Sequence, residues 1–137
     1  MVKKTMKNPK ISIVTAVYNN INTIASSIDS TLSQTYKNIE LVVIDGGSTD
    51  GTLELLKGYG KKIHTLISEP DKGIYDALNK GVKHATGDIV GFMHSDDLFQ
   101  DKNSLKRVAK AFQKNKVDSV YGDLVYVNKE DTSLKWL

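Results

Sequence analysis

The sequence contains no cysteine, only two prolines and a single tryptophan among its 137 residues. Without cysteine there is neither a disulfide framework nor a thiolate metal site, so chemistry must come from carboxylates, hydroxyls and lysines. No apolar run approaches the roughly 20 residues that a membrane-spanning helix needs, and no apolar segment typical of a signal peptide follows the lysine-bearing start. We therefore expect a single cytoplasmic domain over residues 1–137, long enough to bury its own core.

The positive charge of the chain is small and dispersed. Its formal net charge is +3, from 19 lysines and arginines against 16 aspartates and glutamates. The lysines are spread along the sequence, which favours a solvated surface and predicts no nucleic-acid partner. The same charge is compatible with a weak attraction to anionic lipid headgroups. It therefore leaves a peripheral contact at the inner face of the membrane as an alternative. The sequence indicates no oligomeric state.

Short apolar segments alternate with segments of helical periodicity. The predicted strands are Ile11–Val17 and residues 39–44, 63–68 and 89–93, with two short strand-like pieces at 119–121 and 124–127. The predicted helices cover residues 22–36, the region of Leu53 and Leu56, residues 74–82 and residues 105–112. Parallel strands need crossover helices, so this order predicts an α/β fold with a mainly parallel open sheet and helices on both faces.

Polar clusters follow all four main strands. They are residues 16–20, 45–50, 71–73 and 95–97. In open α/β sheets, ligands bind outside the carboxyl ends of the strands. We therefore expect the four clusters to meet at one edge of the sheet and to form the functional site.

Asp45 directly follows an apolar strand and has two interpretations. Its carboxylate could accept a hydrogen bond from the imide N–H of a uracil or from a sugar hydroxyl. Alternatively, it only closes the turn at Gly46 and Gly47, while Thr49 or Asp50 caps the next helix. The sequence does not decide between the two.

Asp96 and Asp97 form an adjacent acidic pair after the fourth strand. Two neighbouring carboxylates repel each other at the edge of a sheet, and a cation relieves that repulsion. Their carboxylate oxygens are suitable ligands for Mg²⁺ or Mn²⁺. Diphosphate oxygens of a substrate would complete the coordination of the ion. The alternative is that one of them merely starts the following loop.

Lys72 and Gly73 lie where the third helix is predicted to begin. Unpaired N–H groups and the helix dipole favour an anion there, and the lysine adds a full positive charge. The alternative is an exposed lysine in a proline-containing turn. Of the three histidines, only His94 lies beside the acidic pair.

Four segments together resemble family 2 glycosyltransferases in order and spacing: ISIVTAVYN at 11–19, VIDGGSTDGT at 43–52, SEPDKGIYDA at 68–77, and residues 85–97 from ATGD to the acidic pair. The resemblance is strongest to the branch that builds O-antigen and capsular polysaccharides. It implies a GT-A fold and metal-assisted, inverting transfer of a sugar from a nucleotide diphosphate donor, with UDP preferred. The acceptor would be a saccharide or a lipid-linked molecule in cell-surface polysaccharide synthesis.

The resemblance also implies roles for individual residues. Tyr18 and Asp45 would contact the base, Asp96 would lie nearer the ribose, and Asp97 would carry the Mg²⁺ or Mn²⁺ with Asp96 beside it. The full predicted nucleotide-binding set is Ala16, Tyr18, Asn19, Asp45, Lys72, Ser95 and Asp96.

Two features depart from the family pattern. His94 stands where the family often has Asp or Asn, which leaves the acidic pair intact. The chain also stops at Leu137, before the half of the fold that carries the Asp or Glu acting on the acceptor hydroxyl, so no catalytic base is assigned. We therefore expect donor binding without efficient transfer.

Two other classes remain as alternatives. One is a donor-binding module without catalysis. The other is a doubly wound signalling domain, which would have its acidic pair after the first strand rather than the fourth.

Overall fold

The computed structural model describes residues 7–115, 126–127 and 135–136. Its strands are β1 (Ile11–Val17), β2 (Ile39–Asp45), β3 (Thr65–Ser68), β4 (Ile89–Phe92), β5 (Tyr126–Val127) and β6 (Lys135–Trp136). Its helices are α1 (Ile21–Leu32), α2 (Thr52–Lys57), α3 (Ile74–His84), α4 (Ser104–Asn115) and the short 3₁₀ helix η1 (Gly60–Lys62). The predicted strand piece at 119–121 lies outside the described residues.

The main sheet has four parallel strands in the order β3-β2-β1-β4. β5 and β6 form a separate antiparallel pair. The central strands β1 and β2 are covered on both faces, which is why they read as continuous apolar runs rather than as an alternation. The predicted α/β class is confirmed.

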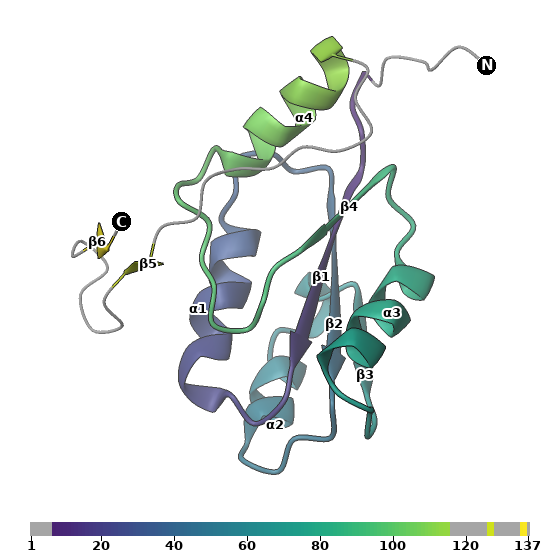
Figure 1. Ribbon diagram of the computed structural model, residues 1–137, viewed down its shortest axis with the longest axis vertical. Helices are drawn as coiled ribbons and strands as arrows, with labels where there is room; N and C mark the ends of the chain where they lie inside the picture. The colour runs from purple at the N-terminus through teal and green to yellow at the C-terminus, as the bar shows by residue number, and fades with distance from the viewer. Residues whose placement is uncertain (1–6, 116–125, 128–134, 137) are drawn as a thin grey trace.

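Each face of the sheet has its own core. Successive side chains of β1 point to opposite faces, so Ile13 packs with residues of α1, α2 and α4, whereas Val14 packs against Ala77 of α3. Figure 1 shows α3 on one side of the strands and α1 on the other, with α4 at the upper end. Among the described helices, none is both long and apolar enough to cross a membrane.

Helix α1 ends at Leu32, four residues before the predicted end at Tyr36. The chain leaves the helix because the Thr35 N–H donates to the carbonyl of Lys102, 2.7 Å away, in the loop before α4. This long-range contact has no signal in the local periodicity.

Strand β3 begins at Thr65, two residues later than predicted, and β4 ends one residue earlier, at Phe92. His64 pairs with Leu41 through its side chain as well as its backbone: the Leu41 N–H donates to the imidazole Nδ1 at 2.9 Å, and the His64 N–H donates to the Leu41 carbonyl at 3.0 Å. The imidazole thus takes the place of a regular strand contact.

Gly81 brings α3 close to the sheet. A Cβ atom at this position would overlap Cγ1 of Val14 on β1. The helix can therefore lie closely against the central strand only with glycine here.

We predict that Gly81→Ala lowers the free energy of unfolding by about 1–2 kcal/mol, because overpacking outweighs the gain in helix propensity. Urea unfolding measures this change. Asn79→Ala, at an exposed position of the same helix, is the control and should raise the midpoint slightly, because alanine is the better helix former and meets no overpacking there. A Gly81→Ala variant as stable as the native chain would contradict the close packing of α3 on Val14.

Glu40 of β2 connects β1 to the segment before β4 at the amino end of the sheet. Its buried carboxylate accepts hydrogen bonds from the Ser12 hydroxyl at 2.7 Å and from the N–H and hydroxyl of Thr86, each at 2.8 Å. Lys10 adds an ion pair at 3.6 Å. Burial raises the pKa of Glu40, but the hydrogen bonds from Thr86 and Ser12 and the Lys10 charge outweigh it and lower the pKa from 4.5 to about 2.

This depressed pKa makes stability depend on pH. The ionised carboxylate contributes about 3 kcal/mol above pH 4.5, and the contribution is lost as the pH falls from 4.5 towards about 2. We predict that Glu40→Gln destabilises the protein by about 2 kcal/mol at pH 7, less at pH 3. Urea unfolding at both pH values tests this, with the exposed Glu54→Gln as control. A Glu40→Gln penalty that stays constant between the two pH values would contradict the prediction.

Candidate functional site

The loops after β1, β2 and β3 lie towards the lower end of the molecule in Figure 1, and the loop after β4 turns beside α1 before it rises to α4. Side-chain hydrogen bonds connect these loops to one another. These contacts show which of the predicted site residues are used to hold the loops in place and which remain exposed.

Asp45 is completely buried at the end of β2. Its Oδ2 accepts hydrogen bonds from the N–H groups of Gly47 at 3.2 Å and Ser48 at 3.0 Å and from the hydroxyl of Ser68 at 2.7 Å. Its Oδ1 accepts a hydrogen bond from the Ser48 hydroxyl. Of the two interpretations, this geometry favours the one in which Asp45 closes the turn.

Asn19 joins the loop after β1 to the loop after β2. Its side-chain oxygen accepts the N–H of Thr49 at 2.7 Å, and its own N–H donates to the Ser48 hydroxyl at 2.8 Å. Its φ of 48° lies in the left-handed region, which asparagine tolerates better than most residues. Ala16, by contrast, is buried in the core beneath α3, so only its backbone can face a ligand.

Asp50 contacts the first residues of two helices, although the N-cap residues are Asn20 for α1 and Gly51 for α2. Its carboxylate accepts the N–H of Ile21, the first residue of α1, at 3.2 Å, and also the N–H of Thr52 at 3.0 Å. The hydrogen bond from the Thr52 hydroxyl is the main cause of the lowered pKa of Asp50. The sequence pattern offered Thr49 or Asp50 as the cap of α2, whereas the N-cap is Gly51, and it gave no signal for the contact of Asp50 with α1.

The loop after β4 is held by the first turns of α1. The Asn20 side chain donates to the Ser95 hydroxyl at 2.8 Å, and the Thr23 hydroxyl donates to the Ser95 carbonyl at 2.9 Å. The Ser27 hydroxyl donates to the carbonyl of His94 at 3.0 Å. Ser95 thus fixes the position of the acidic pair that follows it.

Asp96 is exposed and Asp97 is partly buried. Burial raises the pKa of Asp97, and the charge of Asp96 raises it further, whereas His94 lowers it. A cation would relieve this repulsion between the two carboxylates. Among the described residues, no group of three or more acidic, histidine or cysteine side chains is placed to hold a metal ion. Two adjacent carboxylates supply oxygen ligands of the kind that Mg²⁺ and Mn²⁺ prefer, and they are fewer than a complete set of protein ligands.

Lys72 and Gly73 immediately precede α3. Their N–H groups are not unpaired: the Lys72 N–H donates to Asp76 at 2.9 Å, and the Gly73 N–H donates to Asp71 at 3.0 Å. These two N–H groups are therefore used within the chain. The first N–H groups of α3 itself, from Ile74 on, have no side-chain cap in the structure, so an anion site at the start of this helix, beside the exposed Lys72 side chain, stays a prediction.

Tyr18 lies beside the turn at Gly46, with 62% of its surface exposed. A Cβ atom built on Gly46 would lie 3.3 Å from Cδ1 of Tyr18 and 2.8 Å from Oδ2 of Asp71. The aromatic ring and the Asp71 carboxylate therefore border the same small space. The sequence pattern gives Asp71 no role of its own within its cluster.

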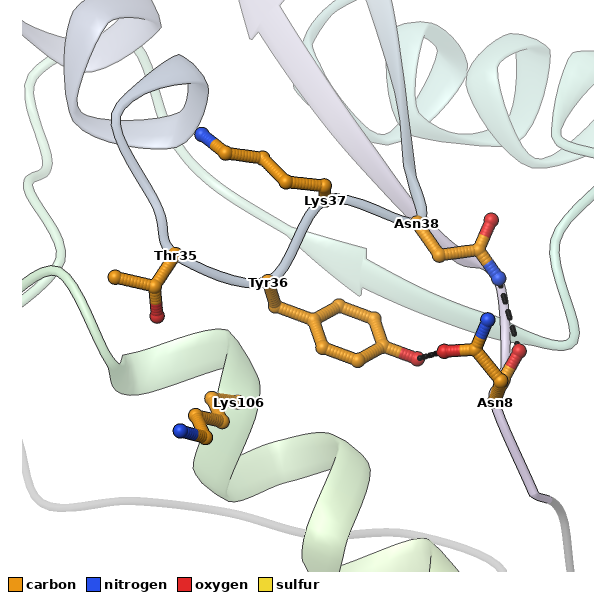
Figure 2. A pocket seen from close by; sticks show the side chains of 6 residues that line it. All are labelled: Asn8, Thr35, Tyr36, Lys37, Asn38 and Lys106. Carbon is orange, nitrogen blue, oxygen red and sulfur yellow. Dashed lines mark hydrogen bonds between the residues drawn. The ribbon is translucent and has the colours of Figure 1, made fainter.

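A separate hollow of about 310 Å³ lies far from this edge, near the amino ends of β1 and β2 (Figure 2). It is lined by Asn8, Thr35, Tyr36, Lys37, Asn38 and Lys106. Figure 2 shows the Tyr36 hydroxyl directed at Asn8, at 3.1 Å, and the Asn38 side chain donates to the Asn8 carbonyl at 2.8 Å. These polar groups hold the start of β1 in place, and none of the predicted site residues lines the hollow.

Residues 12–137 match the family described as Glycosyl transferase family 2. Because the match takes in more than half of the chain, this chain belongs to the family 2 glycosyltransferases. The putative glycosyltransferase EpsE of Bacillus subtilis (strain 168) is 40% identical over 105 residues, which are 74% of this chain and 38% of that protein. The chain spans between 38% and 52% of the length of the curated relatives that it matches.

Two solved structures have the same fold. The mannosyltransferase PcManGT from Pyrobaculum calidifontis, in complex with GDP-Man and Mn²⁺, has a TM-score of 0.71 and 28% identity, covering 87% of this chain and 36% of that one. Residues 1–349 of S. aureus TarS, in complex with UDP-GlcNAc, give a TM-score of 0.72 and 28% identity, covering 78% of this chain and 32% of that one. The expected GT-A architecture is confirmed.

We predict that Asp45→Asn lowers the free energy of unfolding by about 2–3 kcal/mol, because an amide in place of the buried carboxylate sets an N–H against donors that need an acceptor. Chemical unfolding measures the loss. Asp71→Asn, at a partly buried position of the loop after β3, should cost much less, because its carboxylate accepts only the Gly73 N–H among the described residues. Equal midpoints for the two variants would contradict the turn-closing role of Asp45.

Proposed function

We propose that this chain binds the nucleoside diphosphate of a sugar donor, as the donor-binding part of a glycosyltransferase. UDP is the proposed nucleotide, and the acceptor is a saccharide or a lipid-linked molecule in cell-surface polysaccharide synthesis. The observation that carries the proposal is the hydrogen-bonded carboxyl edge, where an exposed Tyr18 and the acidic pair Asp96 and Asp97 lie on adjoining loops. The donors named for PcManGT and TarS, GDP-Man and UDP-GlcNAc, support it.

Each residue of the edge has a physical task in this proposal. The exposed ring of Tyr18 offers a flat apolar surface on which a base can stack. Asn19 and Ser95 fix the loops on either side, and Asp96 lies nearer the ribose. The Lys72 ammonium supplies a positive charge for the diphosphate.

Asp97, with Asp96, would hold the Mg²⁺ or Mn²⁺. The ion, when bound, neutralises negative charge that develops on the departing diphosphate. In the transfer itself the acceptor oxygen bonds to the anomeric carbon, the bond from that carbon to the diphosphate oxygen breaks, and the acceptor proton goes to a base. We assign that base to none of the described residues, so this part of the proposal is limited to donor binding.

We further propose that the protein works in the cytoplasm at the inner face of the membrane, where a lipid-linked acceptor would be found. The dispersed positive charge would permit a weak, peripheral contact with anionic lipids.

Calorimetric titration of UDP in the presence of Mn²⁺, and again with EDTA, tests the proposed site. We expect Mn²⁺ to strengthen UDP binding by about tenfold or more, because two carboxylates otherwise repel the diphosphate. Asp97→Asn should remove most of this metal dependence.

The matched control is Asp88→Asn, since Asp88 lies at the amino end of β4 and accepts only the Lys10 N–H among the described residues. It should bind UDP as the native chain does. Equal UDP affinity with Mn²⁺ and with EDTA would refute the metal assignment, and no binding of UDP or GDP under either condition would refute the proposed function.

A further inference from the structure

We propose that the amino end of the sheet docks on an anionic lipid surface through a basic face formed by Lys37, Lys62, Lys106 and Lys110. This inference rests on the proposed location at the inner face of the membrane and gives that contact a definite surface. The nucleotide site lies at the opposite end of the sheet, so the two can be tested separately.

Helix α4 has a basic outer side and contains no acidic residue. Its apolar side chains Leu105, Ala109 and Phe112 are buried in the core on the α1 side of the sheet. Its exposed charged side chains are Lys106, Arg107, Lys110 and Lys114. Arg107 pairs with Asp101 at 3.0 Å, whereas the three lysines form no ion pair within the described part of the chain. The outer side of α4 therefore carries positive charge that these residues do not neutralise.

Lys37 connects this helix to the neighbouring surface. Together with Lys106 it lines the hollow of about 310 Å³ beside Tyr36 (Figure 2). It also lines a second hollow, of about 530 Å³, which Lys62 and His64 border as well. Because Lys37 belongs to both hollows, the basic side chains of the α1–β2 loop, η1 and α4 form one continuous surface.

The second hollow adds apolar surface to this charge. Leu32, Ile39 and Tyr59 line it, and each of them is only partly buried. Asp29, also in the lining, accepts a hydrogen bond from the Tyr59 hydroxyl at 2.8 Å. Lysines with apolar side chains between them suit the boundary of a bilayer, where anionic headgroups lie next to acyl chains. A nucleic acid presents phosphates without such an apolar layer, so we assign the basic face to lipid.

The opposite end of the sheet has the reverse charge. The residues 45–51, 69–73 and 95–97, which follow β2, β3 and β4, carry Asp45, Asp50, Glu69, Asp71, Asp96 and Asp97 against Lys72. The lysines that are dispersed along the sequence are thus gathered by the fold at the other end, where α4 lies (Figure 1). An anionic bilayer attracts the basic face and repels the carboxyl edge, which orients the donor site towards solution.

This orientation places the proposed donor site at a distance from the bilayer. Strand β1 has seven residues, which span about 23 Å in a β-strand. An acceptor hydroxyl would have to extend about that far from the membrane surface. A saccharide chain carried on a lipid fits this distance better than a single lipid-linked sugar.

Co-sedimentation of the full chain with vesicles tests the basic face. We compare phosphatidylcholine vesicles with vesicles that contain about one-third phosphatidylglycerol, at about 0.1 M salt. We expect the native chain to bind the anionic vesicles about a hundredfold more strongly. The double variant Lys37→Gln/Lys106→Gln should weaken this binding about tenfold or more, because each lysine near an anionic surface contributes about fivefold.

The matched control is the double variant Lys57→Gln/Lys83→Gln, which lowers the formal net charge by the same two units, from +3 to +1. Both lysines are exposed, and they lie on α2 and α3, away from the basic face. This control should bind anionic vesicles within about threefold of the native chain, since charges beyond a Debye length of the surface are screened. Both double variants should bind UDP with Mn²⁺ as the native chain does, which shows that they are folded.

Equal weakening in the two double variants would overturn the basic face, because net charge alone would then account for the binding. Stronger binding of single-stranded RNA than of anionic vesicles, lost in Lys37→Gln/Lys106→Gln, would overturn the assignment to lipid. A native chain that binds UDP with Mn²⁺ but no anionic vesicle would overturn this inference and leave the proposed donor site standing. Vesicle binding without any binding of UDP or GDP would refute the donor site and leave the basic face standing.

Discussion

A buried carboxylate costs several kcal/mol unless hydrogen-bond donors surround it, and at the end of β2 the chain supplies four such donors to Asp45. Two of them are backbone N–H groups of the following turn, so the charge fixes the path of the chain as it leaves the sheet. The hydroxyl of Ser68 is a third donor and connects the end of β3 to the same carboxylate. The whole carboxyl edge depends on this arrangement, because Ser48 also receives the N–H of Asn19 and thereby links the turn to the end of β1.

The two ends of the sheet have different tasks. At the amino end, the Glu40 carboxylate accepts hydrogen bonds from Ser12 and Thr86 and thereby fixes the chain before β4. At the carboxyl end, the side chains that hold the loops are satisfied within the chain, while Tyr18 and Asp96 remain exposed. The proposed binding of a charged donor requires this division, since groups that face a ligand must be held by neighbours that do not.

The sequence predicted the main elements because their signals are local. The apolar runs of β1 and β2 and the helical spacing of α3 and α4 are visible without any structure. The end of α1 was not predictable in this way, since it depends on a contact between Thr35 and Lys102. The site was predicted in part: the clusters were identified, but the sequence could not tell that Asp45 is buried and that Asp71 borders Tyr18. The burial of Asp45 depends on donors of its own turn and on Ser68 of β3, and the approach of Asp71 to Tyr18 depends on the missing side chain of Gly46.

Amide hydrogen exchange measured by NMR tests the central claim about Asp45 most directly. The Gly47 and Ser48 N–H groups lie in a loop, where exchange is normally fast, and the account predicts that both exchange at least about tenfold more slowly than exposed loop amides because the carboxylate accepts them. The Thr49 N–H, bonded to Asn19, should be protected as well. Exchange of Gly47 and Ser48 at the rate of an unprotected loop would contradict the account, because the carboxyl edge would then lack the interaction that holds it together.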